Sequence, residues 1–203
     1  MTIPKRVLKQ LGHPSGFAGR FILRLLNRVN ENMNAKALGA LSINEESRLL
    51  EVGFGGGALI SDTLAAHKLA RIDGCDISKL AVKTAKRRFR GEPCVRFEQN
   101  SGEALPYRDG EFSHLVSVNV IYFWQNQLKM FAEMHRVLER GGRLVLCYSE
   151  FGPDEILQFQ PSEVEAALRM VGFESTHSKP IATNETDSHF CTVGFKPLIS
   201  PAE

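Results

Sequence analysis

Four glycines occupy positions 53, 55, 56 and 57, directly after the apolar run at residues 49–52. Glycine adopts positive φ without strain, and the bare N–H groups of such a loop, at the start of a helix, bind polar ligands. The spacing Gly53-x-Gly55-x-x-Ala58 also satisfies the fingerprint of dinucleotide-binding loops. A tight turn without a ligand needs fewer glycines. The segment therefore predicts a small-molecule site, and the loop alone leaves the ligand open.

Two carboxylates stand beside this loop in the predicted fold. Glu51 lies two residues before the first glycine, where it would repel the pyrophosphate of NAD but could accept hydrogen bonds from a zwitterionic, cationic cofactor. A dehydrogenase would also need a substrate domain, which the sequence does not obviously supply. Asp76 ends the next predicted strand, where a carboxylate can accept from both hydroxyls of a ribose. The alternative is that Asp76 only caps the helix beginning near Ser78.

Apolar runs alternate with helical patterns from about Arg48 onward, as in β-α-β units around a mainly parallel sheet. The predicted strands are residues 48–53, 71–76, 94–99, 112–118 and 143–148. The predicted helices are residues 58–69, 78–90 and 125–140, the last with Leu128 on its packed face and ending at Gly141-Gly142. The tail adds a helix at 161–171 and two strands at 173–179 and 188–195, an antiparallel pair joined by a polar loop at 183–187. The fold class is α/β.

The segment from Glu51 to Gly57 resembles the first motif, E-x-G-x-G-x-G, of class I S-adenosylmethionine-dependent methyltransferases. Residues 74–78 resemble the end of that family's second strand, and residues 100–107 resemble its loop G-D-A-E-x-L-P-F. Residues 133–144 are similar to its segment E-x-x-R-V-L-k-p-G-G-x-l. The resemblance covers about residues 48 to 148, in the family's order.

This resemblance implies a three-layer Rossmann-like fold: a seven-stranded mainly parallel sheet with an antiparallel edge hairpin and helices on both faces. It implies S-adenosylmethionine as the cofactor, across the carboxyl ends of the first, second and fourth strands. The cofactor-binding residues that it implies are Glu51, Gly53, Phe54, Gly55, Gly57, Asp76, Ile77, Ser101, Gly102, Glu103 and Asn119. Ser101 departs from the family's pattern, because most relatives carry there an aspartate that accepts from the adenine amino group.

Methyl transfer is an in-line displacement in which the cofactor supplies the difficult chemistry while the protein aligns the acceptor and excludes water. Tyr122, Phe123 and Trp124 follow the fourth strand and are the substrate candidates, although such a cluster suits rim packing equally well. No residue is compelled to act as a general base, so we name no catalytic residue. A small organic acceptor is expected. A catalytically silent cofactor-binding module and an NAD-dependent oxidoreductase are the alternatives.

Composition indicates a single compact domain. The 203 residues carry 25 Lys and Arg against 23 Asp and Glu, a net charge of +2 that does not predict a nucleic-acid partner. No run approaches the roughly 18 apolar residues of a membrane span, and the first residues lack a secretory signal. We therefore expect a cytoplasmic protein without stable membrane association. The four cysteines are dispersed, which predicts neither a metal site nor a disulfide framework.

Residues 1–47 are predicted to form a helical region before the methyltransferase domain at 48–203. One side of its helix is apolar, with Phe17, Phe21, Ile22, Leu25, Leu26 and Val29. Arg20, Arg24 and Arg28 stack on another side, which Leu23 interrupts. In resembling enzymes this segment packs over the cofactor, so we expect a lid with its hinge at Pro14-Ser15-Gly16. A membrane-surface role is the alternative.

Overall fold

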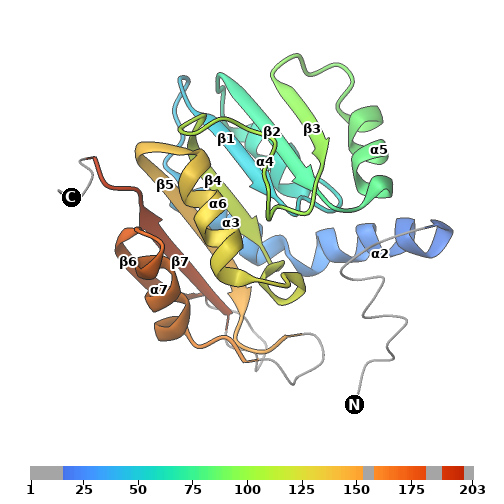
Figure 1. The fold of residues 1–203 in the computed structure, drawn as a ribbon. Coiled ribbons are helices and arrows are strands. Elements are labelled where there is room, and N and C mark those ends of the chain that lie inside the picture. The colour runs from blue at the N-terminus through green and yellow to red at the C-terminus, as the bar shows by residue number, and fades with distance from the viewer. Residues whose placement is uncertain (1–15, 153–157, 182–188, 199–203) are drawn as a thin grey trace.

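A computed structural model describes residues 16–152, 158–181 and 189–198. Its strands form one seven-stranded sheet in the order β3-β2-β1-β4-β5-β7-β6 (Figure 1). The strands are β1 (Arg48–Val52), β2 (Arg71–Asp76), β3 (Val95–Gln99), β4 (Phe112–Val118), β5 (Leu138–Ser149), β6 (Glu174–Ile181) and β7 (His189–Phe195). Neighbouring strands pair in parallel except at β7, which is antiparallel to both β5 and β6. The predicted α/β fold class is confirmed.

Helices cover both faces of the sheet. They are α2 (Gly16–Val29), α3 (Glu31–Leu41), α4 (Ala58–Ala66), α5 (Lys79–Arg88), the 3-10 helix η1 (Ile121–Phe123), α6 (Gln127–Val137) and α7 (Pro161–Met170). Met130, Phe131 and Met134 of α6 are buried with α7 on one face, and α3, α4 and α5 pack on the other. Leu128, predicted on the packed face of α6, is instead exposed. The predicted loop at 183–187, and Pro14 and Ser15, lie outside the described residues.

The predicted helix end at Gly141-Gly142 is wrong. Helix α6 ends at Val137, and Leu138 already has the extended backbone of β5. The ammonium of Lys196 donates to the carbonyl oxygens of His135 and Leu138, each at 2.8 Å. It thereby satisfies backbone acceptors at the end of the helix. Gly141, with φ of +76°, lies inside β5 and donates its N–H to the Lys196 carbonyl. The two glycines therefore belong to an irregular strand.

Helix α2 packs through a side that the sequence pattern does not emphasise. Leu23 is buried in a cluster with residues of α4 and α5, and Gly19, one turn earlier, is buried as well. Phe21, Leu25 and Val29 of the predicted apolar side are exposed. Among the described helices, none combines the length and apolarity that crossing a bilayer requires. These three apolar side chains of α2 thus lie at the surface of the described structure.

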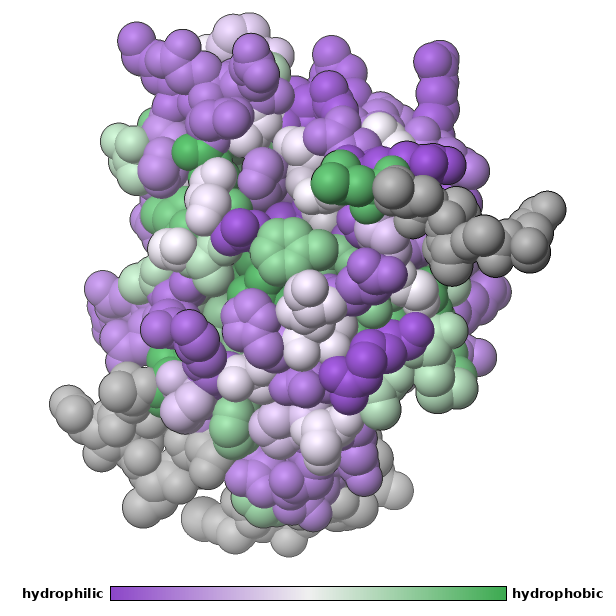
Figure 2. All heavy atoms as spheres, turned by 90° about the vertical axis from the view of Figure 1, so that its left-hand side faces the viewer, coloured by the Kyte–Doolittle hydropathy of each residue, from purple (hydrophilic) through white to green (hydrophobic). Residues whose placement is uncertain are grey.

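The outer edge of the sheet at β6 is polar. Glu174, Lys179 and Pro180 of this strand are exposed, and charged residues and proline on an edge strand discourage pairing with another sheet. Figure 2 shows this side of the molecule as mostly hydrophilic, with apolar side chains in small separate areas. The features that position a ligand lie elsewhere, at the carboxyl ends of the parallel strands.

Candidate functional site

The glycine loop connects the end of β1 to the start of α4. Gly53, Gly55 and Gly57 all have positive φ, at +79°, +51° and +69°. The Gly53 N–H donates to the Cys75 carbonyl at 2.7 Å, which ties the loop to β2. A Cβ atom on Gly53 would lie 2.6 Å from the Val120 side chain, whereas one on Gly55 would meet only Leu23, at 3.9 Å. Gly53 is therefore required for packing, and Gly55 leaves space open in front of the loop.

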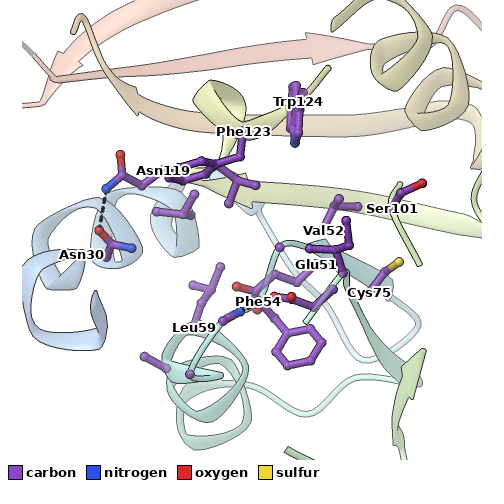
Figure 3. A pocket seen from close by; sticks show the side chains of 18 of the residues that line it. Asn30, Glu51, Val52, Phe54, Leu59, Cys75, Ser101, Asn119, Phe123 and Trp124 are labelled. Carbon is purple, nitrogen blue, oxygen red and sulfur yellow. Dashed lines mark hydrogen bonds between the residues drawn. The ribbon is translucent and has the colours of Figure 1, made fainter. Parts of the chain in front are cut away.

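A cavity of about 450 Å³ opens at this loop (Figure 3). Such a volume is typical of sites for small molecules. It is lined by residues 51–56, 75–77, 118–120 and 123–125, with Asn27, Asn30, Asn34, Ala58, Leu59, Asn100, Ser101 and Glu103. The lining thus joins the carboxyl ends of β1, β2 and β4 to the N-terminal helices, at the edge where open α/β sheets bind ligands.

Most of the residues predicted for the cofactor lie at this cavity. The lining includes Glu51, Gly53, Phe54, Gly55, Asp76, Ile77, Ser101, Glu103 and Asn119. Gly57 and Gly102 do not line it. Gly57 is the N-cap of α4 and faces the Phe89 ring, while Gly102 packs so closely on Met130 that an added Cβ would lie 2.6 Å from its methyl carbon. These two glycines shape the loops behind the cavity.

The three predicted substrate residues are divided by the structure. Phe123 and Trp124 line the cavity, and Figure 3 shows them across from the glycine loop. Tyr122 faces the other way: its hydroxyl donates to the Ser149 carbonyl at 3.1 Å and accepts from the Ser149 N–H. Its ring packs edge-on against Phe159, with 5.1 Å between the centroids. Tyr122 therefore fastens η1 to the end of β5.

Glu51 is the most unusual group in the cavity. Its side chain is buried, and its Oε2 atom has no hydrogen-bond partner among the described residues. Burial, with the nearby carboxylates of Asp76 and Asp62, raises the pKa of the Glu51 carboxyl to about 8. A buried acceptor without a partner is costly, and it becomes satisfied when a ligand brings a donor. The ammonium group of S-adenosylmethionine is such a donor.

Asp76 braces the loop from the end of β2. Its Oδ2 accepts from the Gly55 N–H at 2.8 Å and its Oδ1 accepts from the Ser78 N–H at 2.7 Å. The N-cap of α5 is Ser78, whose hydroxyl accepts from the Ala81 N–H, and Asp76 supports the start of this helix through the Ser78 N–H. A carboxylate can accept several hydrogen bonds, so its contacts with the loop do not by themselves exclude ribose hydroxyls as further donors.

Replacing Asp76 with Ala should weaken S-adenosylhomocysteine binding by about 1.5–3 kcal/mol, roughly ten- to a hundredfold, through lost hydrogen bonds to a charged acceptor. The melting temperature should fall as well, because the Gly55 and Ser78 N–H groups lose their acceptor. Calorimetric titration and thermal unfolding measure the two effects. Unchanged affinity together with lower stability would show that Asp76 is only a brace.

The loops after β2 and β3 form a further, partly apolar wall of the cavity. The Asn100 side chain accepts from the Gly102 N–H at 3.0 Å, and Glu133 of α6 accepts from the Leu105 N–H at 2.8 Å. Ile77, directly after β2, also lines the cavity with 44% of its surface exposed, and Ser101 of the loop after β3 is an exposed lining residue. A large apolar side chain left open at a cavity suits a flat ring such as adenine.

The cavity residues that the sequence-based prediction did not include comprise three asparagines of the N-terminal helical region, Asn27, Asn30 and Asn34. The Asn119 side-chain amide donates to Oδ1 of the Asn30 side chain at 2.9 Å (Figure 3), and Asn119 itself has a φ of +59°. The spacing of three and four residues puts the three asparagines on one side of a helical pattern. The asparagine spacing could therefore have indicated from the sequence, together with the apolar and arginine patterns of the same segment, that this region has a polar side.

The charge of the cavity suits a cationic ligand. Its described lining holds three carboxylates, Glu51, Asp76 and Glu103, and no Lys, Arg or His. A pyrophosphate would meet like charge there, which disfavours NAD. A glycine loop after β1, an acid at the end of β2 and a cavity without cations together define a fold and site of the class I S-adenosylmethionine-dependent methyltransferases.

Comparisons with known proteins agree. A family model described as a methyltransferase domain matches residues 50–146. The methyltransferase YdaC of Bacillus subtilis (strain 168) is 28% identical over 149 residues, which cover 71% of this chain and 81% of YdaC. The chain spans between 40% and 59% of three further curated relatives. These comparisons support a class I methyltransferase that uses S-adenosylmethionine.

Solved structures show the same fold. An S-adenosylmethionine-dependent methyltransferase from Aquifex aeolicus has a TM-score of 0.69 at 16% identity, covering 95% of this chain and 98% of that one. Phosphoethanolamine N-methyltransferase 2 of Haemonchus contortus, in complex with S-adenosyl-L-methionine, has a TM-score of 0.71 at 14% identity. That match covers 82% of this chain and 52% of the other.

Proposed function

We propose that this methyltransferase acts on a small organic acceptor without negative charge, bound beside Asn30, Asn119, Phe123 and Trp124. The observation that carries the proposal is the set of cavity-lining residues, which in the described chain offers carboxylates, carboxamides and two aromatic rings but no cation. An anionic acceptor would lose its hydration there and gain no counter-charge from the side chains that line the cavity, only that of the cofactor's sulfonium. A neutral or cationic flat molecule can pack on the rings and hydrogen-bond to the amides.

The residues of the cavity divide between cofactor and acceptor. We assign the cofactor's ammonium to Glu51, its ribose hydroxyls to Asp76 and its adenine to the wall at Ile77 and Ser101. The wall that remains, with Phe123 and Trp124, is left for the acceptor. The cofactor supplies the methyl group as a sulfonium, and the chain orients the acceptor and keeps water out. In such a transfer the acceptor's lone pair would bond to the methyl carbon as the carbon–sulfur bond breaks, so that S-adenosylhomocysteine and the acceptor's proton are released.

The N-terminal helices complete the cavity, and we propose that residues 1–47 serve as its cover. Asn27 lies so close to the loop that a Cβ on Gly56 would be 2.1 Å from Oδ1 of its side chain. The hydrogen bond from Asn119 to Asn30 joins these helices to the sheet. This arrangement supports a segment that closes over the bound cofactor. We place the enzyme in the cytoplasm, where the four free cysteines stay reduced.

A panel of acceptors of similar size and different charge tests the proposal. With S-adenosylmethionine present, release of S-adenosylhomocysteine is expected with phenol or aniline and not with benzoate or phenyl phosphate. Phe123→Ala should lower turnover about tenfold while the cofactor Kd changes by less than about twofold. Phe151→Ala, an exposed ring outside the cavity, is the control. Turnover that is highest with the anionic acceptors would refute the proposal.

A further inference from the structure

Helix α2 carries an apolar stripe that the described protein leaves open. Phe21, Leu25 and Val29 are 69%, 46% and 62% exposed. Their spacing of four residues aligns them along one side of the helix. A helix on a globular protein normally turns such a stripe toward the core, yet α2 packs through its Leu23 side. In the described part of the chain, the stripe is therefore exposed apolar surface, of the kind that usually contacts a partner.

Helix α5 beside it is strongly basic. Residues 79–90 contain six cations and no acidic residue, although the whole chain has a net charge of only +2. All six are exposed: Lys79, Lys83, Lys86, Arg87, Arg88 and Arg90. Arg88 also donates to the Gly56 carbonyl at 3.0 Å, so the basic segment reaches the glycine loop. Positive charge is thus concentrated on one helix.

The stripe and the basic helix belong to one part of the surface. Leu23 of α2 is buried in a cluster with Ala81, Val82 and Ala85 of α5. Both helices lie at the end of the sheet away from β6 and β7 (Figure 1). Arg28, in the last turn of α2, is exposed as well. The apolar stripe, on the side of α2 opposite Leu23, and the cations of α5 therefore lie on two helices in contact, whose outer surfaces together we call the α2–α5 face.

We propose that the α2–α5 face docks on the surface of an anionic lipid bilayer. Apolar side chains of an amphipathic helix enter the boundary between headgroups and acyl chains, and neighbouring cations attract anionic headgroups. A nucleic acid would use the cations and leave the apolar stripe in water. A second copy of the chain would bring like charges together, which opposes dimer formation through this face.

The same docking would place the cavity near the lipid. Asn27 lies on α2 and lines the cavity, so the helix that contacts the bilayer also forms a cavity wall. This extension rests on the proposed function: the uncharged acceptor would then be a molecule that dissolves in the bilayer. Vesicle binding itself does not require any acceptor, so the docking face and the acceptor assignment are tested separately.

Sedimentation with vesicles tests the apolar stripe. The full chain should pellet with vesicles of phosphatidylcholine and phosphatidylglycerol and stay in the supernatant with phosphatidylcholine alone. Combining Phe21→Ser, Leu25→Ser and Val29→Ser should reduce the partition coefficient at least about tenfold. Met170→Ser with Leu198→Ser, which removes two apolar side chains exposed elsewhere, should leave it unchanged. Thermal unfolding and S-adenosylhomocysteine affinity, expected to be unchanged, verify that the variants fold.

A second pair of variants tests the charge. Lys83→Gln with Lys86→Gln should lower the partition coefficient about thirtyfold, at about 1 kcal/mol for each cation. Lys68→Gln with Lys179→Gln changes the net charge equally at exposed sites elsewhere and should leave binding unchanged. Equal losses in the two pairs would overturn the proposal. So would failure of the parent chain to pellet, a dimer that the stripe variant dissolves, or tight binding of duplex nucleic acid that the stripe variant retains.

Discussion

Replacing Glu51 with Gln is expected to weaken S-adenosylmethionine binding by about ten- to a hundredfold, the cost of losing a hydrogen bond between charged groups. The carboxamide fills the same space but presents no charge to the cofactor's ammonium. The same change should stabilise the cofactor-free protein at and above about pH 8, because it removes the need to ionise a buried carboxyl. Opposite effects on binding and stability distinguish this group from an ordinary core residue.

The pH dependence of the parent protein follows from the raised pKa. The carboxyl of Glu51 has a pKa of about 8 in the fold against an ordinary 4.5, so its contribution to stability is fully present below about pH 4.5. That contribution is lost as the pH rises from 4.5 toward 8. A cofactor that needs the carboxylate must expel the proton, so its affinity should rise with pH up to about 8.

Calorimetric titration near pH 7, in two buffers of different ionisation enthalpy, counts the released proton. The parent chain should release a proton on binding S-adenosylmethionine and Glu51→Gln should not. Glu103→Gln is the matched control, because Glu103 lines the same cavity but is partly exposed and lies 3.6 Å from the Lys129 ammonium. An affinity that does not change with pH, with no proton released, would contradict the role assigned to Glu51.

Replacing Gly55 with Val is expected to reduce cofactor affinity by more than about a hundredfold. Gly55 has a φ of +51°, a region in which a β-branched residue is a steric outlier. The added side chain would also stand in the open space in front of the loop, where no side chain but Leu23 comes within 4 Å of a Cβ atom. The volume that the ligand needs would be partly filled, and the N–H that donates to Asp76 would be displaced.

Gly91→Val is the control for this prediction. Gly91 lies after α5 in an exposed turn, and a Cβ there would meet nothing within 4 Å. Both variants are compared with the parent chain by titration with S-adenosylhomocysteine and by circular dichroism. A Gly55→Val protein that binds the cofactor with parental affinity would remove the glycine loop from the site.

Sequence predicted the frame of the site well, because the information for it is local. Continuous apolar runs indicated the buried strands, and four glycines after the first of them indicated a loop with positive φ. Glu51 and Asp76 could be singled out because each lies at the end of such a run. In a parallel sheet the carboxyl ends of the strands meet at one edge, so residues far apart in sequence could be expected at one site.

The end of α6 and the packed side of α2 depend instead on tertiary contacts. The end of α6 depends on Lys196, whose ammonium reaches Leu138 across 58 residues of sequence. A helical pattern shows which side of α2 is apolar, but the side that packs is chosen by what lies opposite, and there Leu23 fits α5.

Three neighbouring aromatic residues likewise received different roles once η1 turned Tyr122 away from the cavity. Tyr122 bonds with the backbone of Ser149, and Phe123 and Trp124 line the cavity. The sequence by itself therefore predicted a site at the glycine loop with two acids, Glu51 and Asp76, and both line the cavity. The wall that we assign to the acceptor was decided by the tertiary structure, because it is built from side chains, such as Asn30 and Asn119, that meet across 89 residues.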